Sequence, residues 1–370
     1  MPDELTGRSI YDLDTPALVV DRRILQRNIA RLQQAADAAA LELRPHIKAH
    51  KTPVIAQMQV AAGAAGVTAA KVSEAEAMAD GGMADIFIAN EVVGEAKVRR
   101  LAALARRVRL SAAVDSVEVA EGYGRVFAEE GLTLEVLLEV DQGAHRCGVP
   151  ADSAPALAAR VAETPGVAMV GVMAYAGPAY QAGSREGMRA AAAEEAGGLA
   201  QIAAALRSEG HTMRRISGGC TPTGPLYERG CGLTEIRSGT YVFYDMNQVE
   251  LGVADVADVA ATILATVISV PAPDRVILDA GSKALATQVT PVSPGCGWVL
   301  EDLGAVVVKL NDEHGYLDVR RAGRSYQVGD KVQVVPPRLC TALNLYDELH
   351  LCEDRVVVER CDVAARGCSQ

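Results

Sequence analysis

Nearly continuous apolar runs alternate with alanine-rich segments from Ala17 to about Tyr244, and this alternation limits the fold more than any other feature. In the alanine-rich segments, apolar residues recur at the spacing of an amphipathic helix. Apolar strands separated by helices are typical of a parallel sheet covered by helices. About eight or nine such units fit here, and a barrel of this type needs eight. We therefore predict an α/β fold built on a (β/α)8 barrel. The runs expected to form strands are residues 17–20, 66–71, 85–89, 108–114, 134–140, 167–175 and 215–216.

The first long helix of this pattern is predicted over residues 22–40. Asp21 precedes it and is a suitable N-cap, because its carboxylate can accept hydrogen bonds from the first helical turn. The face expected to be buried carries Leu25, Ile29, Leu32 and Ala36.

The composition of the chain changes after about Val249. Alanine-rich segments give way to runs of Val, Ile and Thr, such as Ala261–Val270, and turn residues follow at Pro271, Pro273, Gly295 and Gly315. Runs of β-branched residues between turns indicate antiparallel β structure. We predict two domains, a barrel over residues 15–248 and a C-terminal antiparallel β domain formed by residues 1–14 and 249–370.

The segment Arg44–Pro53 concentrates positive charge between an apolar run and a helix expected to start near Val54. It holds two lysines, Lys48 and Lys51, together with two histidines and an arginine. At the carboxyl end of a barrel strand, such side chains point into the mouth where ligands bind. A desolvated lysine among cationic groups loses its proton more readily, which a Schiff-base amine needs. We therefore interpret Lys48 as the residue that binds pyridoxal phosphate (PLP) covalently, rather than as a solvated surface lysine.

Two glycine-containing loops follow the last expected barrel strands. The first is Ser217-Gly218-Gly219-Cys220-Thr221, and the second is Arg237-Ser238-Gly239-Thr240. Glycines let main-chain amides approach an anion closely, and late barrel loops are a frequent phosphate site. Either loop alone is compatible with an ordinary turn. Because both follow the Lys48 segment, we interpret the pair as the site for the phosphate group of the cofactor.

Several segments resemble one protein family. The Arg-Pro-His-x-Lys-x-His-Lys segment around Lys48 resembles the cofactor segment of the D-threonine aldolase and D-serine dehydratase family, whose barrel is similar to that of alanine racemase. The resemblance continues at Lys71–Ala77, Glu139–Gly148, Ser217–Gly219, Gly239–Tyr241 and Asp279–Lys283. It covers nearly the whole chain. It implies PLP as the cofactor, a small amino acid as the substrate and a homodimer as the assembly.

The resemblance also implies roles for single residues. Lys48 would hold the cofactor, with Lys51 as a neighbour, and loop amides and hydroxyls would bind the phosphate. Arg146 resembles an arginine that contacts the phenolate oxygen of the cofactor, although a surface salt bridge with Asp141 is the alternative. Tyr175 resembles a tyrosine near the pyridine ring; a phenol facing the ring nitrogen would leave that nitrogen largely unprotonated and weaken the electron sink. The expected cofactor-binding residues are Lys48, Arg146, Tyr175, Ser217, Gly218, Gly219, Thr221, Gly239 and Thr240. Ser238 stands where proline is common, which we expect to loosen its loop slightly.

Members of this family also carry a metal-binding histidine followed two residues later by aspartate or cysteine. The matching segment here is Pro336-Pro337-Arg338-Leu339-Cys340, so the cysteine is kept but arginine replaces histidine. An arginine keeps its proton and cannot be a metal ligand. We predict that the usual divalent metal site is absent and that Arg338 acts as a fixed cation. A site rebuilt from His314, His350 or Asp347 is the alternative.

Three reaction classes remain open on these residues. Retro-aldol cleavage of a small D-β-hydroxy amino acid to glycine and an aldehyde needs only a base and an electron sink, so it tolerates loss of the metal best. A racemase or epimerase needs two bases, Lys48 and one of Cys340, Tyr346 or Tyr244. A dehydratase must expel hydroxide, for which a metal helps most, and it ranks third with a non-catalytic PLP carrier. We predict a PLP-dependent lyase of the D-threonine aldolase type, with Lys48, Arg338 and Cys340 as catalytic residues.

The composition argues against other kinds of partner. The chain of 370 residues has a net charge of -11 and no long basic run, so neither nucleic acid nor an anionic membrane is expected to bind it. Its first residues are acidic, and no apolar stretch is long enough to span a bilayer, which predicts a cytoplasmic protein. The eight cysteines include no Cys-x-x-Cys pair, so a structural zinc ribbon has no support.

Overall fold

The computed structural model describes residues 5–287 and 295–370, which fall into two compact units. The barrel unit comprises Ala30–Lys48, Pro53–Gly239 and Cys368–Gln370. The β unit comprises Ala49–Thr52, Thr240–Gly367 and the described residues up to Ile29. The division expected from the sequence, a barrel over 15–248 and a β domain over 1–14 and 249–370, differs from this one at residues 15–29, 49–52, 240–248 and 368–370. Residues 1–4 of the predicted β domain lie outside the described residues.

The barrel unit is built around eight strands, β2 (Glu42–Leu43), β3 (Val67–Ala69), β4 (Asp85–Ile88), β5 (Arg109–Val114), β6 (Leu134–Glu139), β7 (Val167–Met173), β8 (Arg215–Gly218) and β9 (Glu235–Ile236). All pairings are parallel, in the order β2-β9-β8-β7-β6-β5-β4-β3. His46, just beyond β2, bridges Thr68 of β3, and the Thr68 N–H donates to Pro45 O at 2.8 Å. These contacts join the two ends of the sheet, so the predicted (β/α)8 barrel is confirmed.

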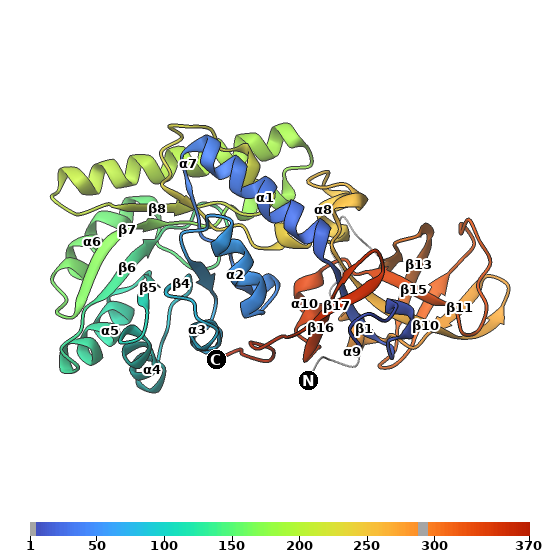
Figure 1. The fold of residues 1–370 in the computed structure, drawn as a ribbon. Coiled ribbons are helices and arrows are strands. Elements are labelled where there is room, and N and C mark those ends of the chain that lie inside the picture. The colour runs from blue at the N-terminus through green and yellow to red at the C-terminus, as the bar shows by residue number, and fades with distance from the viewer. Residues whose placement is uncertain (1–4, 288–294) are drawn as a thin grey trace. The chain divides into compact units, whose positions relative to one another are not determined.

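Helices follow most of these strands and lie on the outer side of the sheet (Figure 1). They are α2 (Pro53–Ala61), α3 (Val72–Asp80), α4 (Glu95–Ala105), α5 (Val117–Glu129), α6 (Ala154–Ala162) and α7 (Arg185–Ser208). Strand β8 is followed only by the short 3-10 turn η5 (Gly224–Leu226). The chain after β8 therefore runs directly into a loop at the carboxyl end of the barrel.

The predicted first helix is α1 (Arg22–Ala39). The Asp21 carboxylate accepts a hydrogen bond from Ile24 N–H at 2.9 Å, so the predicted N-cap is confirmed. The predicted apolar face is buried at all of its members, Leu25, Ile29, Leu32 and Ala36.

The interior of the barrel contains paired charges. Glu235 of β9 is fully buried and accepts hydrogen bonds from Arg44 Nε at 3.1 Å and Arg215 Nη2 at 2.8 Å. Burial alone would raise the pKa of Glu235, but the charges of Arg215 and Arg44 bring it down to about 2. Arg44 also donates to Asp85 Oδ1 at 2.6 Å. These bonds join residues of β4, β8 and β9 to the segment that leads into Lys48, and so fix the strand ends from which the site loops leave.

The β unit is a nine-stranded sheet of β1 (Ala17–Asp21), β10 (Ala261–Ala272), β11 (Arg275–Leu278), β12 (Gly297–Val299), β13 (Asp302–Leu310), β14 (Gly315–Asp318), β15 (Lys331–Val335), β16 (Glu348–Glu353) and β17 (Val356–Asp362). Its order is β11-β14-β13-β12-β15-β10-β1-β16-β17, and β11 also pairs with β10, which closes six strands into an antiparallel barrel. The predicted antiparallel β domain is confirmed. Strand β1, expected at the start of the (β/α)8 barrel, instead pairs with β10 and β16. Short helices α8 (Met246–Glu250), α9 (Ser282–Leu285) and α10 (Leu339–Leu343) belong to the same unit.

Candidate functional site

Lys48 lies in the 3-10 turn η2 (Ile47–Ala49) that follows β2, and its side chain is exposed. The preceding residues are buried, and the His46 N–H donates to Ser238 O at 3.0 Å. The Lys48 N–H in turn approaches His46 Nδ1 at 3.4 Å. The other lysine of the motif, Lys51, belongs to the β unit, is buried and donates to Ala365 O at 3.3 Å. Of the two lysines of the motif, Lys48 is therefore the one that presents an accessible amine at the carboxyl end of a barrel strand.

Two predicted cations face the ring of Tyr175. Lys48 Nζ lies 5.9 Å from the ring centroid, and the guanidinium carbon of Arg146 lies 5.1 Å from it. Tyr175 follows β7, Arg146 follows β6 and Lys48 follows β2, so three separate strand ends supply the group. The structure thus brings together three of the predicted cofactor residues, within reach of one planar ligand.

Arg146 is carried by a loop that folds back on its own strand. Val140 bridges Val149, and the Val149 N–H donates to Glu139 O at 3.0 Å. The side chain of Asp141 accepts hydrogen bonds at 3.0 Å from Gly143 N–H and His145 N–H inside this loop. Among the described residues, no salt bridge joins Asp141 to Arg146. The alternative interpretation of Arg146, a surface salt bridge with Asp141, therefore has no support. Arg146 is exposed and directed to the mouth by a closed loop.

The first glycine loop lies directly after β8, and residues 219–224 are called the anion loop below. The Thr221 hydroxyl oxygen is buried and makes no hydrogen bond to any described residue. An unpartnered buried oxygen costs free energy, which a bound polar ligand would recover. Cys220 lies beside Thr221; burial raises the pKa of its thiol to about 12, a shift that the charge of Lys48 opposes. The anion loop and Lys48 thus both follow strand ends of the barrel unit, β8 and β2.

The second glycine loop packs against the first. The Ser238 hydroxyl donates to Cys220 O at 2.8 Å, which ties the two loops together. This hydroxyl supplies a bond that proline could not, whereas the slight loosening expected at Ser238 relative to proline stays a prediction. A Cβ at Gly239 would lie 2.9 Å from His46 O, so only glycine lets this loop approach the Lys48 segment.

Two predicted phosphate ligands already have other partners. The Ser217 hydroxyl donates to Glu235 Oε1 at 2.5 Å in the barrel interior and accepts a bond from Arg237. The Gly219 N–H donates to the carboxylate of Glu195 on α7, at 3.1 Å from both oxygens. Neither group points to a ligand in this arrangement. Gly218 is the last residue of β8. The polar groups that could contact a phosphate therefore lie beyond it, in the anion loop.

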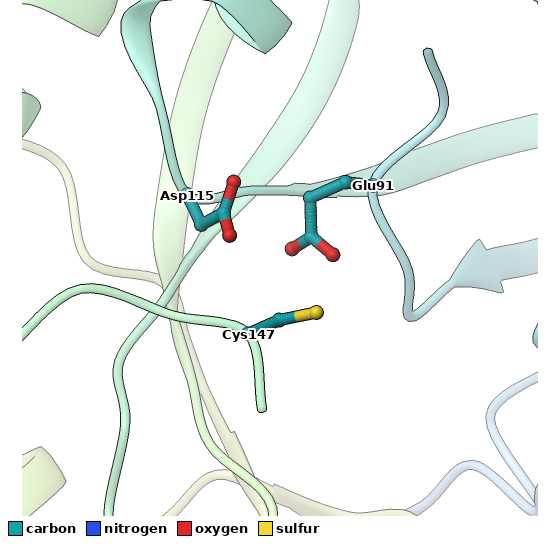
Figure 2. Close-up of side chains that lie close together, drawn as sticks. All are labelled: Glu91, Asp115 and Cys147. Carbon is teal, nitrogen blue, oxygen red and sulfur yellow. The ribbon is translucent and has the colours of Figure 1, made fainter. Parts of the chain in front are cut away.

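Sequence reasoning did not single out an acidic group at the same end of the barrel. Figure 2 shows Glu91, Asp115 and Cys147, which follow β4, β5 and β6 and point toward one another. Their carboxylate and thiol atoms all lie within 4.8 Å of one another. Burial, and then the charges of Glu91 and Glu139, raise the pKa of the Cys147 thiol to about 11. The thiol therefore stays protonated near neutral pH. Each of these three residues follows an apolar run in the sequence, and this position is the signal from which the group could have been predicted.

Glu139, at the end of β6, connects this acidic group to the cations. It is 4% exposed. Burial, and then the neighbouring Glu91, raise the pKa of Glu139 to about 8, whereas Arg237 and Arg146 oppose the rise. The carboxyl end of the barrel thus carries both this acidic group and the cations Lys48 and Arg146, and the charge of Arg146 acts on Glu139 and Cys147.

The remaining predicted residues lie in the β unit. Thr240 Oγ1 is 3.7 Å from Cys340 Sγ, so a predicted phosphate ligand and a predicted catalytic residue are neighbours. Arg338 directly precedes α10, and the next N–H, that of Leu339, donates to Asp245 Oδ2 at 3.2 Å. Burial raises the pKa of Asp245 to about 6, and the charge of Arg338 opposes this rise.

Two of the three residues considered for a rebuilt metal site, Asp347 and His350, have other neighbours. Asp347 pairs with Arg366, and His350 Nε2 lies 3.6 Å from a carboxylate oxygen of Glu348. Within residues 5–287 and 295–370, no group of three potential ligands forms around Cys340.

Comparison with known proteins assigns the chain to a family. The family described as alanine racemase, N-terminal domain, matches residues 20–247, and a serine dehydratase domain matches residues 260–352. D-threonine aldolase from Arthrobacter sp is 35% identical over 374 residues, which cover 100% of this chain and 97% of that protein. This chain belongs to the D-threonine aldolase and D-serine dehydratase family.

Other members of the family match over similar lengths. D-threo-3-hydroxyaspartate dehydratase from Delftia sp. strain HT23 is 36% identical, and the match covers 90% of this chain and 92% of that protein. The crystal structure of D-threonine aldolase from Filomicrobium marinum superposes with a TM-score of 0.91 at 32% identity, covering 100% of both chains. Relatives of this kind imply PLP as cofactor and activity of the lyase type. In the part of the chain that the structure describes, no helix has both the length and the apolar character needed to cross a membrane.

The residues at the mouth of the barrel unit fit PLP. Lys48 offers an exposed amine for covalent attachment, and Arg146 and Tyr175 offer a cation and an aromatic face for the ring. The buried Thr221 hydroxyl lacks a partner that a phosphate oxygen would provide. The strands of the barrel and the loops that follow them hold these groups in position.

Proposed function

We propose that this chain is a PLP-dependent lyase of the D-threonine aldolase type, which cleaves the Cα–Cβ bond of a small D-β-hydroxy amino acid to glycine and an aldehyde. The observation that carries the proposal is the convergence of Lys48 and Arg146 on the ring of Tyr175, beside the anion loop. The carboxyl end of a barrel is where ligands of this fold bind. Identity of 35% to a D-threonine aldolase over the whole chain supports the choice of reaction.

The proposed roles in binding follow from the chemistry of each side chain. Lys48 supplies the amine for covalent attachment, Arg146 faces the phenolate oxygen, and Tyr175 contacts the ring. The Thr221 hydroxyl, the Thr221 N–H and the Gly239 N–H would hold the phosphate. When bound, PLP supplies the electron sink for the pair of electrons left on Cα. The protein's contribution is to fix orientation and charge around that sink.

Cleavage moves one proton and one electron pair in the substrate. A base takes the proton of the β-hydroxyl while the Cα–Cβ bond breaks, the β-carbon leaves as an aldehyde, and Cα later takes a proton to give glycine. We assign this proton transfer to the partly exposed Cys340, whose thiolate form would accept the β-hydroxyl proton and become the thiol that can return it. We assign the substrate carboxylate or hydroxyl to Arg338, because a permanent guanidinium charge stabilises a developing oxyanion without metal ligands.

Dehydration is the second candidate, because a dehydratase of D-threo-3-hydroxyaspartate is 36% identical to this chain. That reaction must expel hydroxide, a poor leaving group for which a metal helps most, so the replacement of a metal-binding histidine by Arg338 counts against it. Racemisation would require a second base. Burial raises the pKa of Tyr346 far above its ordinary value, and its hydroxyl donates to Ala284 O at 3.1 Å, which makes this tyrosine a poor base.

The test is proton NMR of the purified protein with PLP in deuterated water, without added metal. The substrates are D- and L-threonine, their allo isomers and D-threo-3-hydroxyaspartate. We expect glycine and acetaldehyde from a D isomer of threonine, and no reaction of the L isomers. A 2-oxo acid and ammonia would instead identify a dehydratase. Deuterium exchange at Cα with inversion and without cleavage would identify a racemase or epimerase, and no glycine from any D substrate would contradict the proposal.

A further inference from the structure

Glu195 is a buried carboxylate on α7 that lies behind the anion loop. It is 3% exposed, and both of its oxygens accept the Gly219 N–H at 3.1 Å. The Tyr227 hydroxyl donates to the same carboxylate. Burial, and then the charge of Glu195, raise the pKa of Tyr227 well above its ordinary value, so this phenol stays protonated and remains a donor. Two donors therefore converge on one buried acidic side chain.

The same bonds reach the far end of the anion loop. Tyr227 Oη lies 3.1 Å from Thr223 Oγ1, and that oxygen accepts the Cys220 N–H at 3.0 Å. The loop therefore directs two of its amides, those of Gly219 and Cys220, to buried acceptors on its inner side. Gly219 adopts a φ of +82°, a conformation that a residue with a side chain rarely takes. A side chain there would also meet Ile236 and Tyr227 at 3.2 Å.

The hydrogen bonds of Glu195, Tyr227 and Thr223 do not involve Thr221. Pro222 has no N–H, and the Thr221 hydroxyl is buried without a partner. If the Glu195 carboxylate were absent, the Gly219 and Tyr227 donors would lose their acceptor, and the turn would reorient to satisfy them. The position of Thr221 thus depends on the bonds that Glu195 accepts from Gly219 and Tyr227.

We propose that Glu195 and Tyr227 are positioning residues that set the anion loop for a phosphate group, and that they determine the preference for PLP over pyridoxal, its form without phosphate. This inference rests on the proposed cofactor. The role proposed for Glu195 and Tyr227 differs from a general structural role. A residue that positions only the anion loop affects binding of the phosphate group and leaves covalent attachment of the cofactor at Lys48 intact.

The experiment measures the binding of PLP and of pyridoxal to the protein freed of cofactor, by the absorbance of the lysine-bound form. Phosphate alone is then added as a competitor. In E195Q, the amide keeps the shape of the carboxylate but carries an NH2 group that competes with the donors around it. We expect this variant to lose about tenfold in affinity for PLP, the equivalent of about one lost hydrogen bond to a charged group. Its affinity for pyridoxal should change by less than about twofold, the scatter expected for a neutral surface change.

Two further variants sharpen the result. Tyr227→Phe removes one hydroxyl and keeps the packing of the ring, so it gives an answer even if E195Q folds poorly; we expect the same selective loss for PLP, with weaker competition by phosphate. Glu194→Gln changes the exposed neighbour on the same helix and should leave both affinities unchanged. Equal losses for PLP and pyridoxal, or no loss for PLP, would overturn the inference. Failure of the wild-type protein to bind either aldehyde at Lys48 would instead overturn the proposed function, and the inference with it.

Discussion

Replacing Glu235 by glutamine tests the charged frame that holds the strand ends beneath the site. The Glu235 carboxylate is completely buried and accepts hydrogen bonds from Arg44, Arg215 and Ser217. In E235Q the side chain keeps its size but loses its charge. The buried guanidinium of Arg215 then has no carboxylate partner among the described residues, and Arg44 keeps only Asp85.

The size of the effect follows from the pKa of Glu235. Burial raises this pKa, and the charges of Arg215 and Arg44 then lower it from an ordinary value of 4.5 to about 2. Such a depression corresponds to about 3 kcal/mol of stability at neutral pH, since each pKa unit is worth about 1.4 kcal/mol. Breaking one partner of a buried ion pair costs about 3–5 kcal/mol in other proteins. We therefore expect E235Q to lower the free energy of unfolding of the barrel unit by about 3 kcal/mol.

The dependence on pH has a definite sign. A carboxylate with a depressed pKa contributes its stability fully above the pKa of the unfolded chain, near 4.5, and loses it as the pH falls toward 2. The wild-type barrel unit should therefore lose about 3 kcal/mol across this window through Glu235. In E235Q that part of the acid dependence should be missing, because glutamine does not titrate.

The assay is urea unfolding followed by two signals. Trp298, the single tryptophan, belongs to the β unit, so its fluorescence reports that unit, whereas the helical far-UV circular dichroism comes mostly from α2 to α7. E135Q is the matched control. Glu135 pairs with Arg214 at 2.6 Å near the surface, where such a pair is worth about 0–1 kcal/mol. A helical transition that shifts no more in E235Q than in E135Q would refute the reasoning.

Three further predictions concern the site and the assembly. K48A should lose the absorbance band of the lysine-bound cofactor, whereas K51A should keep it; persistence of the band in K48A would contradict the central assignment. R338A should lower kcat/KM by about 100-fold, as expected for the loss of one charged contact in a reacting complex. Chelators should leave the activity of the wild-type protein unchanged. Stoichiometric zinc or manganese in the purified protein, together with loss of activity in chelators, would contradict the prediction that no metal is needed. Sedimentation velocity should show a dimer, and a monomer would contradict the expected assembly.

The sequence was sufficient to predict the barrel because its signal is repeated. Apolar runs and helical segments alternate many times, so one misread unit does not change the fold. Strand β1 shows the limit of this signal. A four-residue apolar run reads the same whichever sheet it joins, and only the pairing of residues 17–20 with β10 and β16 places it in the β unit.

Single side chains of the site were harder to predict than the loops that carry them. Ser217 lies in a glycine-containing segment, but as a residue of β8 it turns its hydroxyl to the barrel interior, toward Glu235. Glu195 was missed because an acidic residue in an alanine-rich helix reads as exposed. Its spacing held a signal, since it lies on the same face as the buried Met188, Leu199 and Ile202. An acidic residue at a position that the helical period assigns to the core requires a buried donor.

Arg338 changes the electrostatics of the β unit as well as its capacity to bind metal. Asp245 is 1% exposed and accepts the Leu339 and Gln248 N–H groups at 3.2 and 3.1 Å. Burial raises the pKa of Asp245 to about 6, and Arg338 supplies the charge that opposes this rise. A histidine at this position would be only partly charged near neutral pH, so it would oppose the rise in the pKa of Asp245 less than arginine does. The guanidinium provides a charge that does not dissociate, so it favours the ionised form of Asp245, the carboxylate that accepts the Leu339 N–H next to Cys340, whether or not a metal is bound.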